Sequence, residues 1–331
     1  MTVKVMINGF GRIGRLVMRA VVETGRKDIE VVAINHPRGV ESAYYLYKYD
    51  SIHGIASGDV KYGDDWIDVG TGKIKLLADR NPSNFDLSDV DVVMECTGVY
   101  KTNDDVKVFL TAGAKKVLVS APKPGDKTIV YGVNHDTLTP DDVIVSNASC
   151  TTNCLAPVAK VLDEKFGIKS GFMTTIHAYT GDQNTLDASH KDNRRARAAG
   201  LSIVPTSTGA ARAISLVLPQ LEGKLDGVAM RVPTPNVSCV DLKVDLNKST
   251  TVAEINSAME DASKGELKGV LGYETEELVS VDFNHNPNSS IFDSTQTMVM
   301  NGNSVRICAW YDNEWGFSMR MLDTCIKMMK F

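Results

Sequence analysis

The chain has 331 residues, with 36 basic and 41 acidic side chains and a formal net charge of −5. This length exceeds what one compact core usually needs, so we expect two domains. The acidic balance argues against a nucleic-acid-binding protein, which needs excess positive charge for phosphate contacts. No apolar run has the pattern of a signal peptide or the length of a membrane span, so we expect a cytoplasmic protein.

Six cysteines in a chain of this kind favour free thiols over a disulfide set. None of them forms a Cys-x-x-Cys pair, and no histidines have metal-ligand spacing. We therefore expect no metal site.

The first part of the chain, residues 1–149, alternates short β-branched runs with amphipathic stretches. The expected strands are residues 3–8, 30–35, 90–96, 116–120 and 143–147. Short, mostly apolar runs are typical of strands buried on both faces. Their alternation with helical patterns predicts a parallel sheet covered by crossover helices.

A glycine-rich motif, GFGRIG, stands between the first strand and the helical pattern that follows it. Gly9 permits the tight turn, Gly11 lets the backbone approach a pyrophosphate, and Gly14 lets helix and strand pack closely. In this context the motif predicts an α/β Rossmann dinucleotide-binding domain whose cofactor also contacts Arg12 and Ile13.

The end of the second strand reads Asn35-His36-Pro37-Arg38, without the carboxylate that usually holds the ribose 2′-hydroxyl of NAD. Arg38 or a protonated His36 would instead suit a 2′-phosphate, so we expect NADP to be accepted, alone or beside NAD. The alternative is that Asn35 serves NAD and His36 only caps a turn.

The second part of the chain, residues 150–315, has longer strand patterns at 171–179, 227–232 and 237–246 and a helical pattern at 251–264. It predicts an α+β catalytic domain with a mixed, largely antiparallel sheet. We expect the last helix, within residues 316–331, to return to the first domain. No Pro-rich linker separates the two parts, so we expect them to be packed together.

A candidate nucleophile, Cys150, lies between a strand and the apolar helical pattern at 155–166. At a helix N-terminus its thiolate would be favoured by backbone N–H groups and by the helix dipole, which lower a thiol pKa. His177, at the end of a strand pattern, is the best candidate for its base, although a lone histidine is more often structural. We expect Cys154, one turn along, to point away from the site and to be buried.

Taken together, the motifs closely resemble those of phosphorylating glyceraldehyde-3-phosphate dehydrogenases over essentially the whole chain. The matching stretches are INGFGRIGR, KYDSIHG, ECTG, SCTTNC, TTIHAYT, RRARAA, TSTGAA, RVPTPNVS and WYDNEWG. The resemblance implies oxidation of D-glyceraldehyde 3-phosphate to 1,3-bisphosphoglycerate with reduction of NAD or NADP. The intermediates would be a thiohemiacetal and a thioester on Cys150, with His177 as the base.

The resemblance also implies the residues of the remaining subsites. They are Thr180, Asp182 and Arg231 for the substrate phosphate; Ser149, Thr151, Thr208 and Gly209 for the attacking phosphate; and Thr97, Ser120, Ala188, Ser189, Asn313 and Phe317 for the cofactor. Asn313 would hold the nicotinamide carboxamide. Phe317 stands where a tyrosine is usual, and we expect its ring to stack without the hydroxyl.

Two places depart from many NAD-using relatives, which carry Asp where this chain has His36 and Leu-Pro where it has Ala188-Ser189. Ser189 could donate a hydrogen bond to a 2′-phosphate, whereas a proline could not. The resemblance further implies a homotetramer, with the basic run at residues 194–197 in a subunit contact and not on nucleic acid. Two alternatives stay open: an erythrose-4-phosphate dehydrogenase, and a binding or regulatory homologue without activity.

Overall fold

The structure is a computed structural model that describes residues 2–123 and 125–331. The chain divides into two compact units. The first comprises Met1–Ile129, His135–Ala148 and Ser318–Phe331, and the second comprises Val130–Asn134 and Ser149–Phe317. The chain thus re-enters its first unit within helix α7 (Trp315–Met328). The short segment Val130–Asn134 belongs to the second unit. The sequence pattern placed it in the first domain, which was expected to span residues 1–149.

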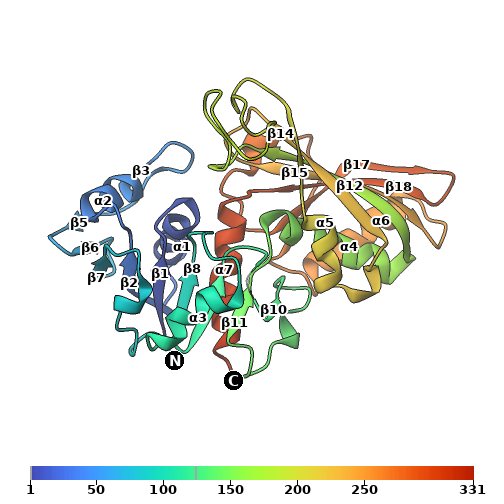
Figure 1. Cartoon of the computed structure of the whole chain (residues 1–331). Helices are drawn as coiled ribbons and strands as arrows, with labels where there is room; N and C mark the ends of the chain where they lie inside the picture. Colours follow the sequence, from blue (N-terminus) through green and yellow to red (C-terminus); the bar gives the residue numbers. More distant parts are fainter. Residues whose placement is uncertain (1, 124) are drawn as a thin grey trace. The chain divides into compact units, whose positions relative to one another are not determined.

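A nine-stranded sheet forms the centre of the first unit (Figure 1). In spatial order its strands are β10 (Lys127–Thr128), β11 (Ile144–Ser146), β9 (Lys116–Val119), β8 (Val92–Glu95), β1 (Val3–Asn8), β2 (Ile29–Asn35), β7 (Lys73–Leu77), β6 (Trp66–Asp68) and β5 (Lys61–Tyr62). From β10 to β7 every pair of neighbours is parallel. This arrangement confirms the expected Rossmann sheet.

The edge β7-β6-β5 is antiparallel and was not expected from the sequence. β5 is exposed, and in β6 and β7 buried residues stand singly between exposed or half-buried ones, so these short strands lack the buried apolar run that predicts a central strand.

The helices described in this unit are α1 (Arg12–Glu23), α2 (Val40–Lys48), α3 (Asn103–Thr111) and most of α7. Met6, Val93, Phe109 and Val117 form part of a fully buried apolar cluster between the sheet and α3. On α7, the Thr324 hydroxyl donates to Asn147 Oδ1 at 2.8 Å. Minor elements are β3 (Tyr49–Asp50), β4 (Gly54–Ile55) and short 3₁₀ turns at Pro82–Asn84 and His135–Thr137.

The second unit contains a seven-stranded sheet. Its order is β13 (Val204–Ser207), β14 (Leu225–Val232), β12 (Ile168–Ala178), β15 (Ser238–Leu246), β18 (Ser304–Tyr311), β17 (Ser290–Met300) and β16 (Leu271–Glu274). The pairs β12–β14 and β16–β17 are parallel and the other pairs are antiparallel. The predicted mixed, largely antiparallel sheet is confirmed.

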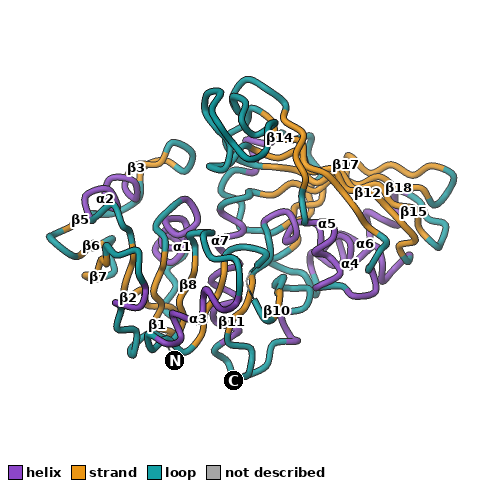
Figure 2. The backbone as a smooth tube through the Cα atoms, in the orientation of Figure 1, coloured by secondary structure: helices purple, strands orange, loops and turns teal. Residues whose placement is uncertain are grey.

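Helices α4 (Cys150–Phe166), α5 (Ala210–Ala213) and α6 (Val252–Lys264) pack against this sheet (Figure 1). Short 3₁₀ turns occur at Ile214–Leu216, Pro219–Leu221 and Ser280–Phe283. Residues 179–203 contain no helix or strand and form a long connection between β12 and β13 (Figure 2). None of the helices in the described ranges is long and apolar enough to cross a membrane.

Candidate active site

The glycine motif forms a tight loop between β1 and α1. Gly9 has φ +92°, and a Cβ there would lie 2.6 Å from Thr97 Cγ2. A Cβ on Gly14 would lie 2.1 Å from the Gly9 carbonyl oxygen, so neither position accepts a side chain. Gly11 faces open space and begins α1 without a side-chain cap. Uncapped N–H groups at a helix start attract anions, so this loop fits the pyrophosphate of a dinucleotide.

Arg12, on the first turn of α1, is held by Asp50. Its Nη1 and Nη2 donate to the two carboxylate oxygens at 2.6 and 3.3 Å. Burial opposes the ionisation of Asp50, but the N–H groups of His53 and Ile52 and the charge of Arg12 lower its pKa to about 2. Ile13, the next residue, is half-buried. The guanidinium is therefore oriented by Asp50.

The end of β2 differs from expectation in two respects. Asn35 is buried, and both ends of its amide are paired. Its Nδ2 donates to Asn8 Oδ1 at 2.8 Å, and its Oδ1 accepts from Asp79 N at 3.3 Å. Burial, with the charges of Arg15 and Arg38, lowers the pKa of His36. These effects favour the neutral ring, so they disfavour the protonated His36 expected from the sequence. Arg38 is exposed and remains the cationic candidate for a 2′-phosphate.

Thr97 and Ser120 follow strands β8 and β9 at the carboxyl edge of the parallel sheet, where α/β folds bind their ligands. The Thr97 backbone N–H donates to Glu95 Oε1 at 2.8 Å, and its hydroxyl contacts the same oxygen. Glu95 itself is buried, and burial raises its pKa. Ser120 is half-buried.

The structure brings Cys150 and His177 together in the second unit. Cys150 is the first residue of α4, and the Ser149 hydroxyl caps this helix by accepting from Thr152 N at 3.1 Å. His177 is the penultimate residue of β12. The Cys150 Sγ lies 3.6 Å from the His177 Nε2, within hydrogen-bond range for sulfur. This is the geometry of a nucleophile and its base.

The electrostatic state of this pair corrects the sequence-based expectation of a depressed thiol pKa. Surrounding protein atoms desolvate the sulfur, and this raises the pKa of Cys150 more than Arg231 and the N–H groups at the start of α4 lower it. Burial and the charge of Arg231 lower the pKa of His177 to about 3. Both shifts favour a neutral thiol beside a neutral imidazole.

Arg231, on β14, pairs in register with His177 on the neighbouring strand β12. Its Nη1 lies 2.6 Å from the His177 Nδ1 and donates to the Ala178 carbonyl oxygen at 3.1 Å. The same carbonyl lies 2.7 Å from Nδ1. Nδ1 can donate to Ala178 or accept from Arg231, but not both, so this contact decides whether Nε2 presents a lone pair or a proton to the sulfur.

Three hydroxyl groups meet behind the nucleophile. Tyr311 OH lies 2.9 Å from Thr151 Oγ1 and 2.9 Å from Thr175 Oγ1, and all three residues are buried. The Tyr311 ring also meets the His177 ring edge-on, with centroids 5.9 Å apart. Sequence reasoning missed Tyr311, because a tyrosine in the apolar strand β18 gives no signal of a functional contact.

Asp182 forms an ion pair with Arg195, from the basic run at residues 194–197. A carboxylate repels phosphate, so Asp182 fits an anion subsite by holding this arginine and not as a ligand. Burial lowers the pKa of Arg231, and the charge of Arg195 adds a smaller effect in the same direction. Sequence reasoning placed the basic run in a subunit contact and missed Arg195. An arginine beside expected anion-binding residues was the available signal.

The other expected anion-binding residues lie near helix or strand ends. Thr208 Oγ1 accepts from Ala210 N at 3.2 Å, and Gly209 is the residue that precedes α5. Thr180 is half-buried, two residues after β12.

The second-unit residues expected to contact the cofactor differ in exposure. Ala188 and Ser189 are exposed on the long connection. Asn313 is buried after β18, and its Oδ1 accepts from the Ser238 hydroxyl at 2.8 Å. Phe317 is buried within α7.

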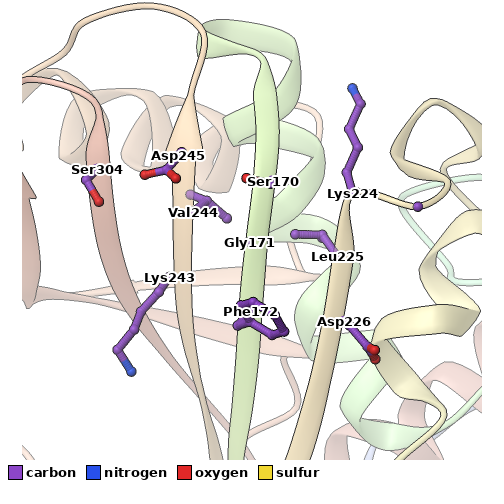
Figure 3. A pocket seen from close by; sticks show the side chains of 11 residues that line it. Ser170, Gly171, Phe172, Lys224, Leu225, Asp226, Lys243, Val244, Asp245 and Ser304 are labelled. Carbon is purple, nitrogen blue, oxygen red and sulfur yellow. The ribbon is translucent and has the colours of Figure 1, made fainter.

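A separate surface pocket on the second sheet contains none of the expected site residues (Figure 3). Residues of strands β12, β14, β15 and β18 line it, together with Lys224, which precedes β14. In residues 2–123 and 125–331 no three His, Cys, Asp or Glu side chains cluster as metal ligands would.

A Rossmann unit with a glycine loop, followed by a unit that pairs a cysteine with a histidine, defines the class of a nicotinamide-dependent oxidoreductase. Family comparison agrees: residues 3–103 match the glyceraldehyde 3-phosphate dehydrogenase NAD binding domain, and residues 149–313 match the C-terminal domain of the same family.

Curated relatives match the whole chain. A glyceraldehyde-3-phosphate dehydrogenase of Cereibacter sphaeroides is 62% identical over 329 residues, 99% of each chain. One of Xanthobacter flavus is 59% identical over 333 residues, 100% of this chain and 99% of the relative. A chloroplastic form A of Zea mays is 55% identical over 327 residues, 97% of this chain and 81% of the relative. The chain belongs to the glyceraldehyde 3-phosphate dehydrogenase family.

Proposed function

We propose that this protein oxidises D-glyceraldehyde 3-phosphate, with inorganic phosphate, to 1,3-bisphosphoglycerate and reduces a nicotinamide cofactor. The observation that carries the proposal is the 3.6 Å contact between the Cys150 Sγ and the His177 Nε2. The names of the relatives that match the whole chain support the same substrate.

In the resting pair His177 is available as the base. Burial and the charge of Arg231 lower its pKa, so its ring is neutral at physiological pH and can take the thiol proton as Cys150 attacks the aldehyde carbon. The ring then returns this proton to the developing alkoxide, which gives a thiohemiacetal on Cys150. A nicotinamide bound beside Cys150 would supply the hydride acceptor. His177 removes the hydroxyl proton as the hydride leaves, and a thioester remains on Cys150.

Phosphate completes the reaction by attacking the thioester carbon, and the Cys150 sulfur leaves. The site must hold two anions, one on the substrate and one attacking it. Arg231, with Thr180, fits the first, and Arg195 is a cation held ready by Asp182. Ser149, Thr151, Thr208 and Gly209 supply hydroxyl and N–H groups for the second. When Arg231 donates to an anion, Nδ1 of His177 is left to donate to Ala178, which makes Nε2 the acceptor for the thiol proton.

Dual use of NAD and NADP is part of the proposal. It is supported by exposed Arg38 and by the absence of a carboxylate at the end of β2. Asn35 and His36 contribute no charge there. Ser189, exposed on residues 179–203, is a further donor for a 2′-phosphate.

A homotetramer and a cytoplasmic location remain predictions from the sequence. For assembly, the described surface offers support: Leu186, Leu201 and Ile203 on the long connection are each more than two-thirds exposed. Apolar side chains gathered on one exposed segment are typical of subunit interfaces.

Initial rates with NAD and with NADP, each with and without inorganic phosphate, test the proposal. We expect turnover to require phosphate and to be lost in Cys150→Ser, because a serine hydroxyl is a far weaker nucleophile than a thiol. A rate that ignores phosphate would support release of the acyl group by water, as in an erythrose-4-phosphate dehydrogenase. Full activity of the serine variant would assign the chemistry to another residue.

A further inference from the structure

Ser238 connects the segment that carries His177 to Asn313 through two buried hydrogen bonds. Its Oγ accepts from Ala178 N at 3.0 Å and lies 2.8 Å from Asn313 Oδ1. Ser238 is 1% exposed and Asn313 is 6% exposed. The carbonyl of Ala178 in turn contacts the His177 Nδ1. One hydroxyl thus joins the backbone beside the proposed base to the amide expected to hold the nicotinamide.

The hydrogens of this contact follow from counting donors. A backbone N–H can only donate, so the Ser238 hydroxyl accepts from Ala178. The hydroxyl's own hydrogen then needs an acceptor, because an unpaired buried donor is costly. Asn313 Oδ1 is that acceptor; with the amide reversed, the hydroxyl would face a second donor. In residues 2–123 and 125–331 this is the one hydrogen bond of the Asn313 side chain, so its Nδ2 is left to donate elsewhere.

The backbone around the contact is held from both sides. Val237 has φ +66° and is buried, a strained conformation for a β-branched residue that persists only where its surroundings impose it. Asn236 donates to Asp312 Oδ2 at 2.9 Å, and Asp312 Oδ1 accepts from two N–H groups at the start of α7. Ser238 also pairs in register with the end of β18. The contact is therefore built into the fold.

We propose that Ser238 is a positioning residue that fixes the amide of Asn313 so that its Nδ2 is presented to the nicotinamide carboxamide. The inference rests on the proposed function for the identity of that ligand. A fixed donor recognises the carboxamide oxygen, and thereby selects which face of the nicotinamide ring takes part in hydride transfer. A free amide would present oxygen or nitrogen and would hold the ring in either orientation.

Binding of NAD and of ADP-ribose, which lacks the nicotinamide, tests this role without turnover. We expect Ser238→Ala to weaken NAD by about fivefold to tenfold, the value of one buried hydrogen bond, and to leave ADP-ribose within about twofold. Ser238→Thr keeps the hydroxyl and should restore NAD binding. Ser290→Ala is the matched control, because Ser290 is a fully buried serine of the same sheet whose hydroxyl contacts Cys154. Unchanged NAD affinity, or equal weakening of both ligands, would overturn the proposal.

Hydride transfer gives a second readout. With an aldehyde deuterated at its reacting carbon, wild type and Ser290→Ala should label one face of the nicotinamide, and Ser238→Ala should label both. If Ser238→Ala does not fold, Ser238→Cys replaces it, because a thiol keeps the volume and is a weaker donor. This variant should lose facial selectivity to a smaller degree. Wild-type selectivity in Ser238→Cys would equally overturn the proposal. A wild-type protein that turns over without phosphate would refute the proposed function and leave the comparison of NAD with ADP-ribose intact.

Discussion

At the scale of single residues, burial and not local sequence sets the charge state of the site. The start of α4 and Arg231 both favour a Cys150 thiolate, as the sequence predicts for the helix start. Desolvation of the sulfur raises the pKa of Cys150 by more than these two features lower it. Burial lowers the pKa of His177, which likewise favours the neutral form of that side chain. Two groups that would otherwise form an ion pair are thus held uncharged until a substrate is attacked.

The buried imidazole predicts a pH dependence of stability. The folded pKa of His177, about 3, lies below the ordinary value of about 6.5, so only the unfolded chain binds a proton at this side chain in between. Its contribution to stability is complete above pH 6.5 and is lost as the pH falls toward 3. We expect the melting temperature of His177→Asn to fall less than that of wild type between pH 7 and 4. The same change at His53 is the control, and parallel curves for wild type and His177→Asn would contradict the argument.

Arg38 carries the prediction on cofactor choice. A charge-assisted hydrogen bond to a 2′-phosphate contributes about 1.5–3 kcal/mol, so Arg38→Ala should lower kcat/KM for NADP by about 10- to 150-fold. NAD lacks this phosphate, and its kcat/KM should change by less than about twofold. Lys169→Ala removes an equally exposed charge from the second unit and should affect neither cofactor. Equal losses for both cofactors in Arg38→Ala would mean that Arg38 does not read the 2′-phosphate.

At the scale of elements, α4 is longer than its apolar pattern. The pattern begins at Leu155, but the helix begins at Cys150, because its first turn is polar and is stabilised by the Ser149 cap instead of by an apolar face. Pro157 lies inside the helix, where it cannot donate to the preceding turn. The helix persists because it is buried against the second sheet along most of its length.

Two caps in the second unit allow the contribution of Ser149 to stability to be separated from its contribution to activity. Thr251 caps α6 by accepting from Glu254 N at 3.2 Å, much as Ser149 caps α4. Each substitution by alanine should lower stability by about 0.5–2 kcal/mol, measured by urea unfolding. Ser149→Ala should also slow turnover, since it removes both the cap of the turn that carries Cys150 and a hydroxyl proposed to hold the attacking phosphate. If Thr251→Ala slowed turnover equally, loss of stability would explain both.

At the scale of the whole molecule, the clearest exposed feature is the connection at residues 179–203. It has no helix or strand and presents large apolar side chains to solvent in the single chain. The second sheet also exposes Phe172, beside the pocket of Figure 3, and Val228. Such surface is costly in water unless another surface covers it.

Assembly is therefore predicted to depend on this connection. We expect Leu201→Asp, at a side chain 82% exposed, to lower the molar mass measured by light scattering after gel filtration, because a buried charge disrupts an apolar interface. Val252→Asp places the same charge on the exposed side of α6 and should leave the mass unchanged. An unchanged mass for Leu201→Asp would exclude this connection from the interface.

The sequence by itself determined the fold class and the glycine loop, and its resemblance to a known family implied the pairing of Cys150 with His177. These depend on alternating patterns and on motifs whose residues lie close together in the chain or have a recognisable spacing. Only the tertiary structure decided that both groups of the pair are neutral, that Asn35 faces inward and that Asp182 holds an arginine. It also revealed Ser238, whose role comes from partners 60 residues before it and 75 residues after it. Burial and hydrogen-bond partners are set by segments distant along the chain, and a linear pattern carries no record of them.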